Sequence, residues 1–569
     1  MNTFFEELTR AQESRMAIEK LYIEMRHVLN NGYFKPTGRT GKPLIEALLT
    51  LRPEIYGSIN DPEKVELEGI VYVIDRLPKG IEMCRLIKLI SEEGYEKSHF
   101  EKIIPRSRIR NCYRIDAEQM FIEVTRGKSE IYDILTHLTF LYNEAEKIRR
   151  KVTLPNQEKL PEWNYLEQLV LQQKSLNPQE QEIAFTYLTT ILGRTFDEVV
   201  HAYKRLAAHP KTNNDLFHIV YWLGRISIEE YTLGKDRIIT FTPILRERIG
   251  KHIYGERWAL LIKQKLQELQ LLDRPLHIIS ANMHSVMNSF FAYPVFLEKY
   301  KQQFSINSIA LELIKPENQS IKKEIEQFAQ KHGMYDLPVK SGTFMPVQIF
   351  DTTKLPFDQL SPEITFDLEY IQCEKPVILV MDYAFGEQAF ETMDELLKPF
   401  KTEQGTFPMN VSSISIMGKA GILHGGKGDI MIPTSFVFEG TADNYPIQNQ
   451  FTKKDFEDSD LQVFEGCMIT VLGTSLQNKD VLSYFKNSTW RAIGLEMEGA
   501  HYHKAIQASA LIRKHIQPNV TLRYAYYASD NPLVSGSTLA SGSLGEIGVK
   551  PTYLITIKIL NSILRRPNS

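Results

Sequence analysis

Cysteine is scarce in this sequence. Its 569 residues include four cysteines, Cys84, Cys112, Cys373 and Cys467, and no two of them form a Cys-x-x-Cys pair. A disulfide framework or a zinc site built from cysteine pairs is therefore not expected. The pattern is typical of a reducing compartment such as the cytoplasm.

Long apolar segments and an excess of one charge are also missing. No run approaches the roughly 18–20 apolar residues that a membrane-spanning helix needs, and residues 1–7 lack the basic and apolar regions of a signal peptide. A net charge of −3 provides no general attraction to nucleic acid or acidic membranes. We interpret the basic stretch at residues 147–151 as a solvated helix end. We expect a cytoplasmic protein with neither nucleic acid nor a membrane as partner.

What is present is the composition of a folded globular protein, 43% hydrophobic and 24% charged. The length exceeds what one hydrophobic core usually holds. Apolar residues recur at helical spacing in the first half, for example at Ile131, Ile134 and Leu138. We predict an α-helical domain over residues 1–151, a second helical segment over residues 152–272, and a third region over residues 273–569.

In this third region, short apolar runs rich in β-branched residues alternate with helical stretches. The runs cover residues 276–279, 376–381, 411–417, 467–472 and 522–528. Such alternation predicts an α/β domain with helices on both faces of its sheet. Ligands of these sheets bind at the carboxyl ends of the strands, and the polar motifs of the region fall at those ends.

Three motifs follow the apolar runs in order. Gly418, Lys419 and Gly421 end the run at 411–417, where glycines allow a ligand to approach the backbone closely. Residues 496–498, Glu-Met-Glu, stand where an apolar segment turns into a helix, and the run at 522–528 ends in residues 529–530, Ser-Asp. Carboxyl groups at the mouth of a sheet suit chemistry on a sugar–base bond, because the leaving base must be protonated.

Taken together, these motifs resemble the nucleoside phosphorylase superfamily, and most closely its methylthioadenosine/S-adenosylhomocysteine nucleosidases. Residues 417–423 and 427–432 are similar to the family's Gly-Ser-Ala-Gly-Gly turn and the Val-Gly-Asp-Ile-Val that follows it. Residues 473–476 resemble its base-side loop, residues 495–499 its Val-Glu-Met-Glu-Ala, and residues 529–530 its strand-ending Ser-Asp. The resemblance covers roughly residues 275 to 565. It implies an α/β fold with a nucleoside phosphorylase-like mixed sheet and flanking helices, preceded by a mostly α-helical N-terminal region.

The resemblance also implies roles for individual residues. Asp530 stands at the position of the general acid, and Ser529 at that of its orienting neighbour. Glu498 stands where the family binds the ribose hydroxyls, with Met497 beneath the sugar, and Ser475 lies in the base-side loop. Gly418, Lys419 and Gly421 stand in the ligand-binding turn, and Tyr445 is the candidate for an aromatic that one subunit lends to its neighbour's pocket in a homo-oligomer.

Two departures from the family pattern leave alternatives open. Where the nucleosidases carry a glutamate that activates water, this sequence has His284, and Glu387 at another strand–helix turn is an alternative activator. Lys419 replaces the usual serine, so it could receive a phosphate or pair with a carboxylate. The small-residue stretch at 535–543 could wrap a phosphate or form a surface loop.

We therefore expect a nucleosidase that hydrolyses the N-ribosyl bond of a purine nucleoside or nucleotide, without an organic cofactor. No metal is expected, because His501 and His503 are two residues apart on a helix and point to different faces. One alternative is a phosphorylase that uses phosphate as co-substrate. The other is a nucleotide-binding or scaffold protein that keeps the fold without turnover.

Overall fold

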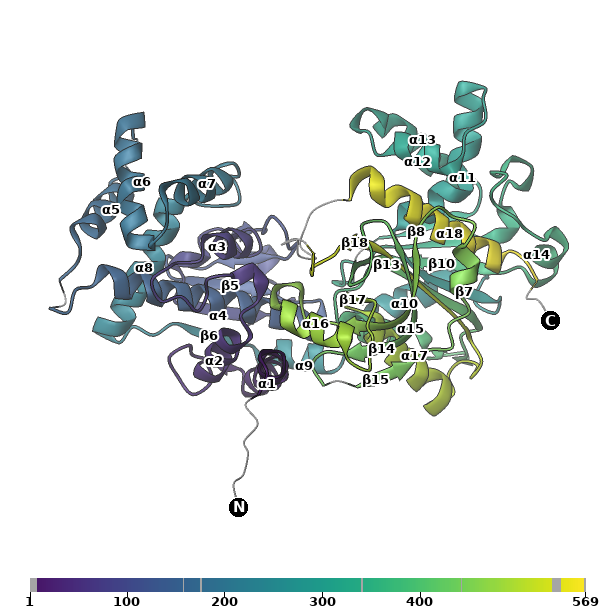
Figure 1. Cartoon of the computed structure of the whole chain (residues 1–569). Helices are drawn as coiled ribbons and strands as arrows, with labels where there is room; N and C mark the ends of the chain where they lie inside the picture. Colours follow the sequence, from purple (N-terminus) through teal and green to yellow (C-terminus); the bar gives the residue numbers. More distant parts are fainter. Residues whose placement is uncertain are drawn as a thin grey trace, which may run out of the picture. The chain divides into compact units, whose positions relative to one another are not determined.

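The computed structural model describes residues 8–156, 158–173, 176–338, 341–441, 443–534 and 544–566. Its contacts divide the chain into two compact units (Figure 1). Unit 1 comprises residues 1–251 together with residues 475–481, and unit 2 comprises residues 252–474 and 482–569.

Unit 1 is built mainly from helices, most of them with clear end signals. Thr9 with Gln12, Asn177 with Glu180 and Thr195 with Glu198 form capping boxes, in which side chains satisfy the free amides of the first turn. The helices are α1 (Arg10–Asn31), α2 (Lys42–Leu51), α3 (Leu67–Ile74), α4 (Gly127–Val152), α5 (Pro161–Leu171), α6 (Pro178–Leu192), α7 (Phe196–Ala207), α8 (Leu216–Leu233) and α9 (Pro243–Gly250).

Unit 1 also contains a six-stranded sheet that the helical prediction for this region did not include. Its strands are β1 (Tyr33–Phe34), β2 (Leu86–Ile90), β3 (Glu101–Ile103), β4 (Cys112–Arg114), β5 (Gln119–Glu123) and β6 (Ile238–Phe241). The order is β1-β6-β2-β5-β4-β3, with β6, β2 and β5 parallel and the outer pairs antiparallel. These strands have five residues or fewer, too few for a period-two pattern to stand out from helical spacing.

Unit 2 has the α/β fold that the apolar runs and the resemblance predicted. Its strands are β7 (Leu276–Ser280), β8 (Met334–Leu337), β9 (Val347–Asp351), β10 (Val377–Met381), β11 (Phe400–Thr402), β12 (Gly405–Phe407), β13 (Val411–Ile422), β14 (Ile430–Phe438), β15 (Asn444–Pro446), β16 (Val463–Thr470), β17 (Gly494–Glu496) and β18 (Thr521–Asp530). The ten-stranded sheet runs β15-β14-β16-β17-β13-β7-β10-β9-β8, and β18 pairs with both β13 and β14. Strands β13, β18, β14, β16 and β17 therefore close into a ring.

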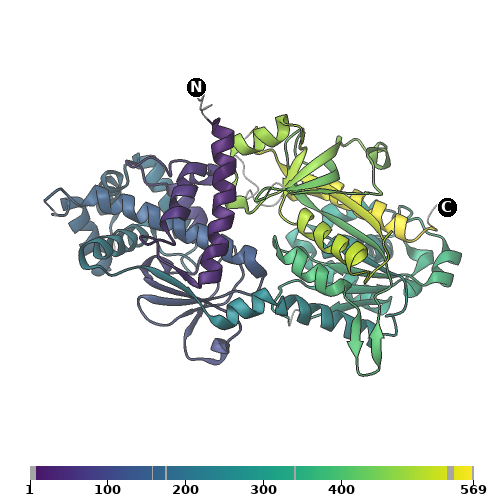
Figure 2. The same ribbon diagram turned by 90° about the horizontal axis from the view of Figure 1, so that it is seen from below.

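Helices cover both faces of this sheet, as Figures 1 and 2 show. The helices that lie in unit 2 for all or most of their length are α10 (Ile253–Glu268), α11 (Met283–Tyr300), α12 (Ile306–Leu313), α13 (Gln319–Lys331), α14 (Leu368–Glu374), α15 (Gln388–Leu397), α16 (Lys479–Asn487), α17 (Gly499–Gln507) and α18 (Val549–Ile563). Helices α11, α12, α13 and α18 pack together on one face, and α10, α15 and α17 pack together on the other. Central strands β7 and β10 are buried along their whole length, which is why they appear as continuous apolar runs.

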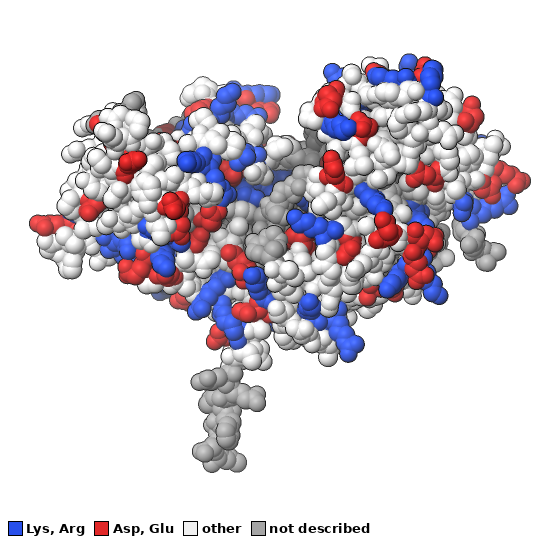
Figure 3. Space-filling view, turned by 45° about the horizontal axis from the view of Figure 1, so that its top comes forward, with Lys and Arg blue, Asp and Glu red and all other residues white. Residues whose placement is uncertain are grey.

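The surface and the helices add two general findings. On the face drawn in Figure 3, basic and acidic side chains are mixed on both units, in line with the small net charge. Among the described residues, every helix is too short or too polar to cross a lipid bilayer.

Candidate active site in unit 2

A cavity of about 200 Å³ lies in unit 2 at the carboxyl ends of β7, β10 and β13. It brings together two motifs that are almost eighty residues apart in the sequence: Gly418 and Lys419 from the end of β13, and Met497 and Glu498 from the start of α17. The carboxyl ends of parallel strands meet at one edge of a sheet, and that edge is where α/β proteins bind ligands.

Glu498 lines this cavity and is half-buried. Its Oε1 accepts a hydrogen bond of 2.9 Å from the amide of Gly386, in the turn after β10. Burial and the nearby carboxylate of Glu496 raise the pKa of Glu498 to about 8. This carboxyl therefore holds its proton over much of the neutral range.

Glu496 is buried and positions the start of α17. Its Oε2 accepts hydrogen bonds from the amides of Glu498, at 2.6 Å, and Gly499, and its Oε1 accepts one of 2.5 Å from the Thr470 hydroxyl. Burial raises the pKa of Glu496 to about 7. Both carboxyl oxygens of Glu496 therefore already accept hydrogen bonds from groups of the protein itself.

Asp530 ends β18 and is fully buried. Burial raises the pKa of its carboxyl, and Ser529 and the positive charges of Lys419 and Lys427 offset part of that effect. Its Oδ1 lies 2.5 Å from the Ser529 hydroxyl oxygen, and its Oδ2 has no hydrogen-bond partner among the described residues. Asp530 is not among the residues that line the cavity, whereas Tyr526, four residues earlier on β18, is one of them. The pairing of β18 with β13 is irregular between these two residues, where Ala420 faces Ala528 and Gly421 faces Asp530.

The hydrogen bonds of Ser529 bear on the protonation of Asp530. The Ser529 hydroxyl oxygen lies 3.0 Å from the carbonyl of Ala420 and 2.5 Å from Asp530. A serine hydroxyl has one proton, and a carbonyl only accepts. Both bonds form at once when Ser529 donates to Ala420 and a protonated Asp530 donates to Ser529.

Three tyrosines in the cavity wall were missed by the sequence reasoning. Tyr383 follows β10, Tyr502 lies on α17 and Tyr526 lies on β18. The Tyr502 hydroxyl lies 3.2 Å from that of Ser280, whereas the Tyr526 hydroxyl has no partner among the described residues. For Tyr383 and Tyr526, a position close after or within a predicted strand was the available signal, because such residues line the carboxyl edge of a sheet. Tyr502 lies on a helix and carried no such signal.

The two candidates for activating water lie outside the cavity wall. His284 is exposed in the first turn of α11, where its amide donates a hydrogen bond of 3.0 Å to Asn282. Glu387 is half-buried at the start of α15. Asp382, directly after β10, lies within electrostatic reach of His284, and burial raises the pKa of Asp382.

The remaining predicted residues occupy different places. Gly421 pairs with Leu495 and Asp530 inside the sheet. Ser475 belongs to unit 1, where it hydrogen-bonds with Tyr56, and its neighbour Thr474 lines the cavity. Tyr445 is half-buried on β15, at the edge of the sheet. The stretch 535–543 lies outside the described residues.

One group of potential metal ligands occurs in the described part of the chain: His252, Asp394 and Glu395. Basic side chains already neutralise its carboxylates. Arg513 Nη1 lies 3.1 Å from Asp394 Oδ2, and Lys398 Nζ lies 2.5 Å from Glu395 Oε1. We therefore interpret the group as a cluster of ion pairs that holds the C-terminal part of α15 in place.

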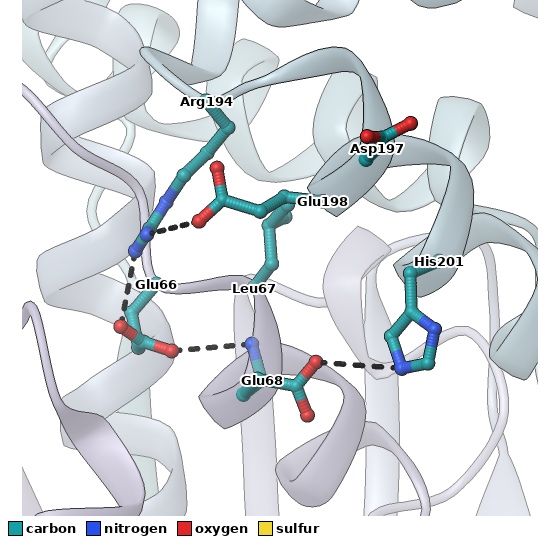
Figure 4. A pocket seen from close by; sticks show the side chains of 7 residues that line it. All are labelled: Glu66, Leu67, Glu68, Arg194, Asp197, Glu198 and His201. Carbon is teal, nitrogen blue, oxygen red and sulfur yellow. Dashed lines mark hydrogen bonds and ion pairs between the residues drawn. The ribbon is translucent and has the colours of Figure 1, made fainter.

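Unit 1 has a hollow of about 250 Å³ between the first turns of α3 and α7. Figure 4 shows Arg194 extended between Glu66 and Glu198, at 3.0 and 3.1 Å from their carboxylate oxygens. Glu68 pairs with Arg205 and lies 3.9 Å from His201. Most of the acidic side chains in this hollow therefore have basic partners, which indicates a structural cluster.

A family model matches residues 42–302 and 311–565, which include most of both units. This chain belongs to DUF6909, a family of unknown function. The match spans the helical half as well as the α/β half, so the two units are parts of one family architecture. No curated protein matches this DUF6909 member.

Several solved structures resemble part of this DUF6909 chain. Native futalosine hydrolase of Helicobacter pylori is 12% identical with a TM-score of 0.29, over 51% of this chain and 97% of its own. The 5'-methylthioadenosine/S-adenosyl homocysteine nucleosidase of Helicobacter pylori is 13% identical with a TM-score of 0.28, again over 51% and 97%. Uridine phosphorylase of Schistosoma mansoni is 10% identical with a TM-score of 0.30, over 52% and 89%. Values this low support no conclusion about the activity of this chain.

Proposed function

We propose that unit 2 is a nucleosidase that hydrolyses the N-ribosyl bond of a purine nucleoside or nucleotide. The observation that carries this proposal is the meeting of Glu498 and Met497 with Gly418 and Lys419 in one cavity. Its size, about 200 Å³, lies below the range of about 300–1,000 Å³ typical of drug-sized ligands. It suits a ligand of the size of a single nucleoside rather than a dinucleotide.

In the proposed reaction, Asp530 is the general acid, and because it lies outside the cavity wall, its side chain or the wall would have to move when substrate binds. Breaking the bond between ribose and base passes through an oxocarbenium-like state, and the departing base needs a proton. The pKa of Asp530, which burial raises above its ordinary value, supports this role as a proton donor. Glu498 binds the ribose hydroxyls, Met497 packs beneath the sugar, and the tyrosines of the wall contact the base.

The group that activates water is proposed to be His284 or Glu387. Each stands at the carboxyl edge of the sheet, His284 after β7 and Glu387 after β10. Because neither lines the cavity, the side chain or its loop would have to move toward the ribose when substrate binds. Water activation is therefore the step to test separately for each residue.

Two alternatives are each favoured by one observation. Lys419 lines the cavity and its charge reaches Asp530, with Lys427 nearby, which suits phosphate as a co-substrate and hence phosphorolysis. The position of His284 and Glu387 outside the wall suits a protein that binds a nucleoside or nucleotide without turnover.

One experiment separates these three functions. Purified protein is incubated with adenosine, inosine, methylthioadenosine and AMP, with and without phosphate, and free base is measured. Base release without phosphate supports hydrolysis, and release that requires phosphate supports phosphorolysis. Tight binding without product supports the non-catalytic protein.

We further propose that the protein forms a homo-oligomer through the edge of the unit 2 sheet. Strand β15, which carries Tyr445, is an end strand of that sheet, and edge strands offer unpaired backbone groups to a second chain. Light scattering coupled to gel filtration tests this, and a monomer at micromolar concentration contradicts it.

A further inference from the structure

Unit 1 contains a cavity of about 650 Å³ between helices α5, α6, α7 and α8, which pack together and are labelled in Figure 1. Its volume lies within the range of about 300–1,000 Å³ that is typical of small-molecule sites, and such sites occur between the helices of bundles. The unit 2 cavity and the hollow between α3 and α7 are smaller, at about 200 and 250 Å³. The described residues that line the larger cavity all belong to unit 1, so a ligand there is independent of the function proposed for unit 2.

One part of the cavity wall is apolar and aromatic. Leu169 and Val170 contribute aliphatic side chains from the end of α5, and Tyr203 and Phe217 contribute rings from α7 and α8. The centroids of these two rings lie 5.4 Å apart, with an angle of 58° between the ring planes. Such rings can cover the apolar part of a ligand and can also attract a cation placed over their faces.

The other part of the wall offers hydrogen-bond acceptors from two side-chain amides. Gln181 Nε2 donates a hydrogen bond of 3.1 Å to the Tyr203 hydroxyl oxygen, and Asn214 Nδ2 donates one of 2.6 Å to Glu82 Oε1. The nitrogen of each amide therefore faces a group of the protein. The carbonyl oxygen of each amide has no hydrogen-bond donor among the described residues, so both oxygens can accept from a ligand.

His218, also in the wall, is oriented by the buried side chain of Glu82. Its Nδ1 lies 3.0 Å from Oε1 of Glu82, which is 3% exposed. Burial opposes ionisation of Glu82, but the hydrogen bond with His218 and the charge of that ring bring the pKa of Glu82 below its ordinary value. The ionised carboxylate balances any charge on the ring, so the pair adds no net positive charge to the wall. Nε2 points away from Glu82, because the two nitrogens of an imidazole face nearly opposite sides.

Asp215 gives the wall a negative charge. It stands directly before α8, where its Oδ1 accepts a hydrogen bond of 2.9 Å from the amide of His218. Its side chain is exposed and has no basic partner among the described residues. Burial of Tyr203 and the charge of Asp215 both raise the pKa of Tyr203, so this charge reaches the aromatic part of the wall. None of the described lining residues is a lysine or an arginine.

We propose that this cavity of unit 1, between α5, α6, α7 and α8, binds a small organic amine. An ammonium group donates hydrogen bonds and carries the charge opposite to that of Asp215, so it matches both the carboxylate and the carbonyl oxygens of Asn214 and Gln181. The aromatic pair suits the ammonium group and the apolar body of such a ligand. An anion would meet Asp215 without a compensating cation, and a neutral molecule would gain nothing from that charge.

Isothermal titration calorimetry on the full-length protein tests the proposal with probes of similar shape and different charge. Tryptamine carries an ammonium group, tryptophol is the corresponding neutral alcohol, and indole-3-acetate carries a carboxylate. The variant Asp215→Asn removes the negative charge, and because asparagine is as good a helix cap as aspartate, the start of α8 is preserved. The control is Asp197→Asn, which removes an exposed carboxylate from the first turn of α7, outside this cavity.

Tryptamine is expected to bind the wild type at least about tenfold more tightly than tryptophol, the effect of one charged hydrogen bond, and indole-3-acetate is expected to bind more weakly than either. Asp215→Asn should remove the advantage of tryptamine over tryptophol, and Asp197→Asn should leave it unchanged. Absence of tryptamine binding to the wild type overturns the proposal, as does equal binding of the three probes. An affinity for tryptamine that is the same in Asp215→Asn as in the wild type also overturns it.

Tyr203 provides a second pair of variants that tests the aromatic part of the wall. Tyr203→Phe keeps the ring and loses the hydroxyl group, whereas Tyr203→Leu keeps an apolar side chain and loses the ring. Tryptamine should bind Tyr203→Phe about as well as the wild type and Tyr203→Leu about fivefold more weakly, the effect of one cation–π contact. Wild-type affinity for tryptamine in Tyr203→Leu would contradict binding of the amine in this cavity.

Discussion

The surroundings of Asp530 favour its protonated form, which a general acid needs. Asp530 is fully buried at the end of a strand, and the one oxygen with a partner faces a serine whose hydroxyl also faces a carbonyl. A neutral carboxyl satisfies this arrangement better than a carboxylate does, because it can donate. Lys419 and Lys427 act in the opposite direction and limit how far the pKa rises.

At this scale the sharpest test is Asp530→Asn. The amide has nearly the same shape but no acidic proton, so base release should fall by about a hundredfold or more, the usual range for losing a general acid. Release of base is measured by chromatography, and the urea midpoint of the variant controls for folding. Unchanged turnover in a folded variant would rule out the assigned acid.

Glu498 offers a second test, through pH. Its pKa of about 8 means that it gains charge as pH rises from about 7 to about 9, and a carboxylate accepts hydrogen bonds from ribose hydroxyls better than a neutral carboxyl does. We expect adenosine to bind the Asp530→Asn variant more tightly as pH rises through this interval. Calorimetry measures this affinity, and the Asp530→Asn variant is used so that the substrate is not cleaved during the titration.

The double variant Asp530→Asn with Glu498→Gln is the control for this pH effect. Its glutamine cannot ionise, so the pH dependence should disappear. An affinity that rises equally in both proteins would assign the effect to another group.

At the scale of elements, strand β17 places both glutamates. Its three residues pair with β16 on one side, and two of them, Gly494 and Leu495, pair with β13 on the other. The chain then turns directly into α17. Gly494, the first residue of β17, is packed so closely that an added Cβ would lie 2.4 Å from Met431 Sδ and 2.7 Å from the carbonyl oxygen of Gly421.

Gly494→Ala should therefore destabilise the protein by about 1–3 kcal/mol, the usual cost of overpacking, measured by urea denaturation. It should also impair nucleoside binding, because β17 carries Glu496. The matched control is Gly426→Ala, where a Cβ meets nothing within 4 Å. Equal stability of the two variants would contradict the close packing around β17.

For the whole molecule, buried carboxyls make stability depend on pH. Burial raises the pKa of Glu439 and of Glu496 to about 7 each, from an ordinary value of 4.5. Between these values the folded state holds protons that the unfolded state has released, so the free energy of unfolding should fall as pH rises from about 5 to about 8. Urea midpoints across this range measure it.

Glu439→Gln isolates one contributor to this dependence. Glu439 is buried and accepts a hydrogen bond of 3.2 Å from the amide of Leu472, which a glutamine carbonyl also can accept. The variant should have a shallower decline of stability with pH. A stability that instead increases between pH 5 and 8 would contradict the proposed protonation of these groups.

The limits of the domains can be tested at the same scale. The sequence predicts limits at residues 151/152 and 272/273, whereas contacts divide the chain at 251/252 and assign residues 475–481 to unit 1. In unit 1, Asn478 donates a hydrogen bond of 2.8 Å to the carbonyl of Leu51. Limited proteolysis with mass spectrometry decides between stable fragments that begin near residue 273 and fragments that begin near residue 252.

Sequence patterns predicted unit 2 more fully than unit 1, for a physical reason. Strands such as Val377–Met381 are buried on both faces and appear as uninterrupted apolar runs. The short strands of unit 1, such as β2 with exposed Leu86 and half-buried Lys88, do not differ enough from helical spacing to be recognised. Tyr383 and Tyr526 were missed because an aromatic residue in or near a strand is equally typical of a core, and Tyr502 because it lies on a helix.

By itself, the sequence determined that the C-terminal half is an α/β domain with its polar motifs at strand ends, since strand periodicity and residue order are local properties of the chain. Only the tertiary structure decided which of those motifs share a cavity, because closing the ring of β13, β18, β14, β16 and β17 brings Lys419 and Glu498 together. It also decided which charges meet: Arg110 pairs with Glu130 and Asp133 only when β4 lies against β5.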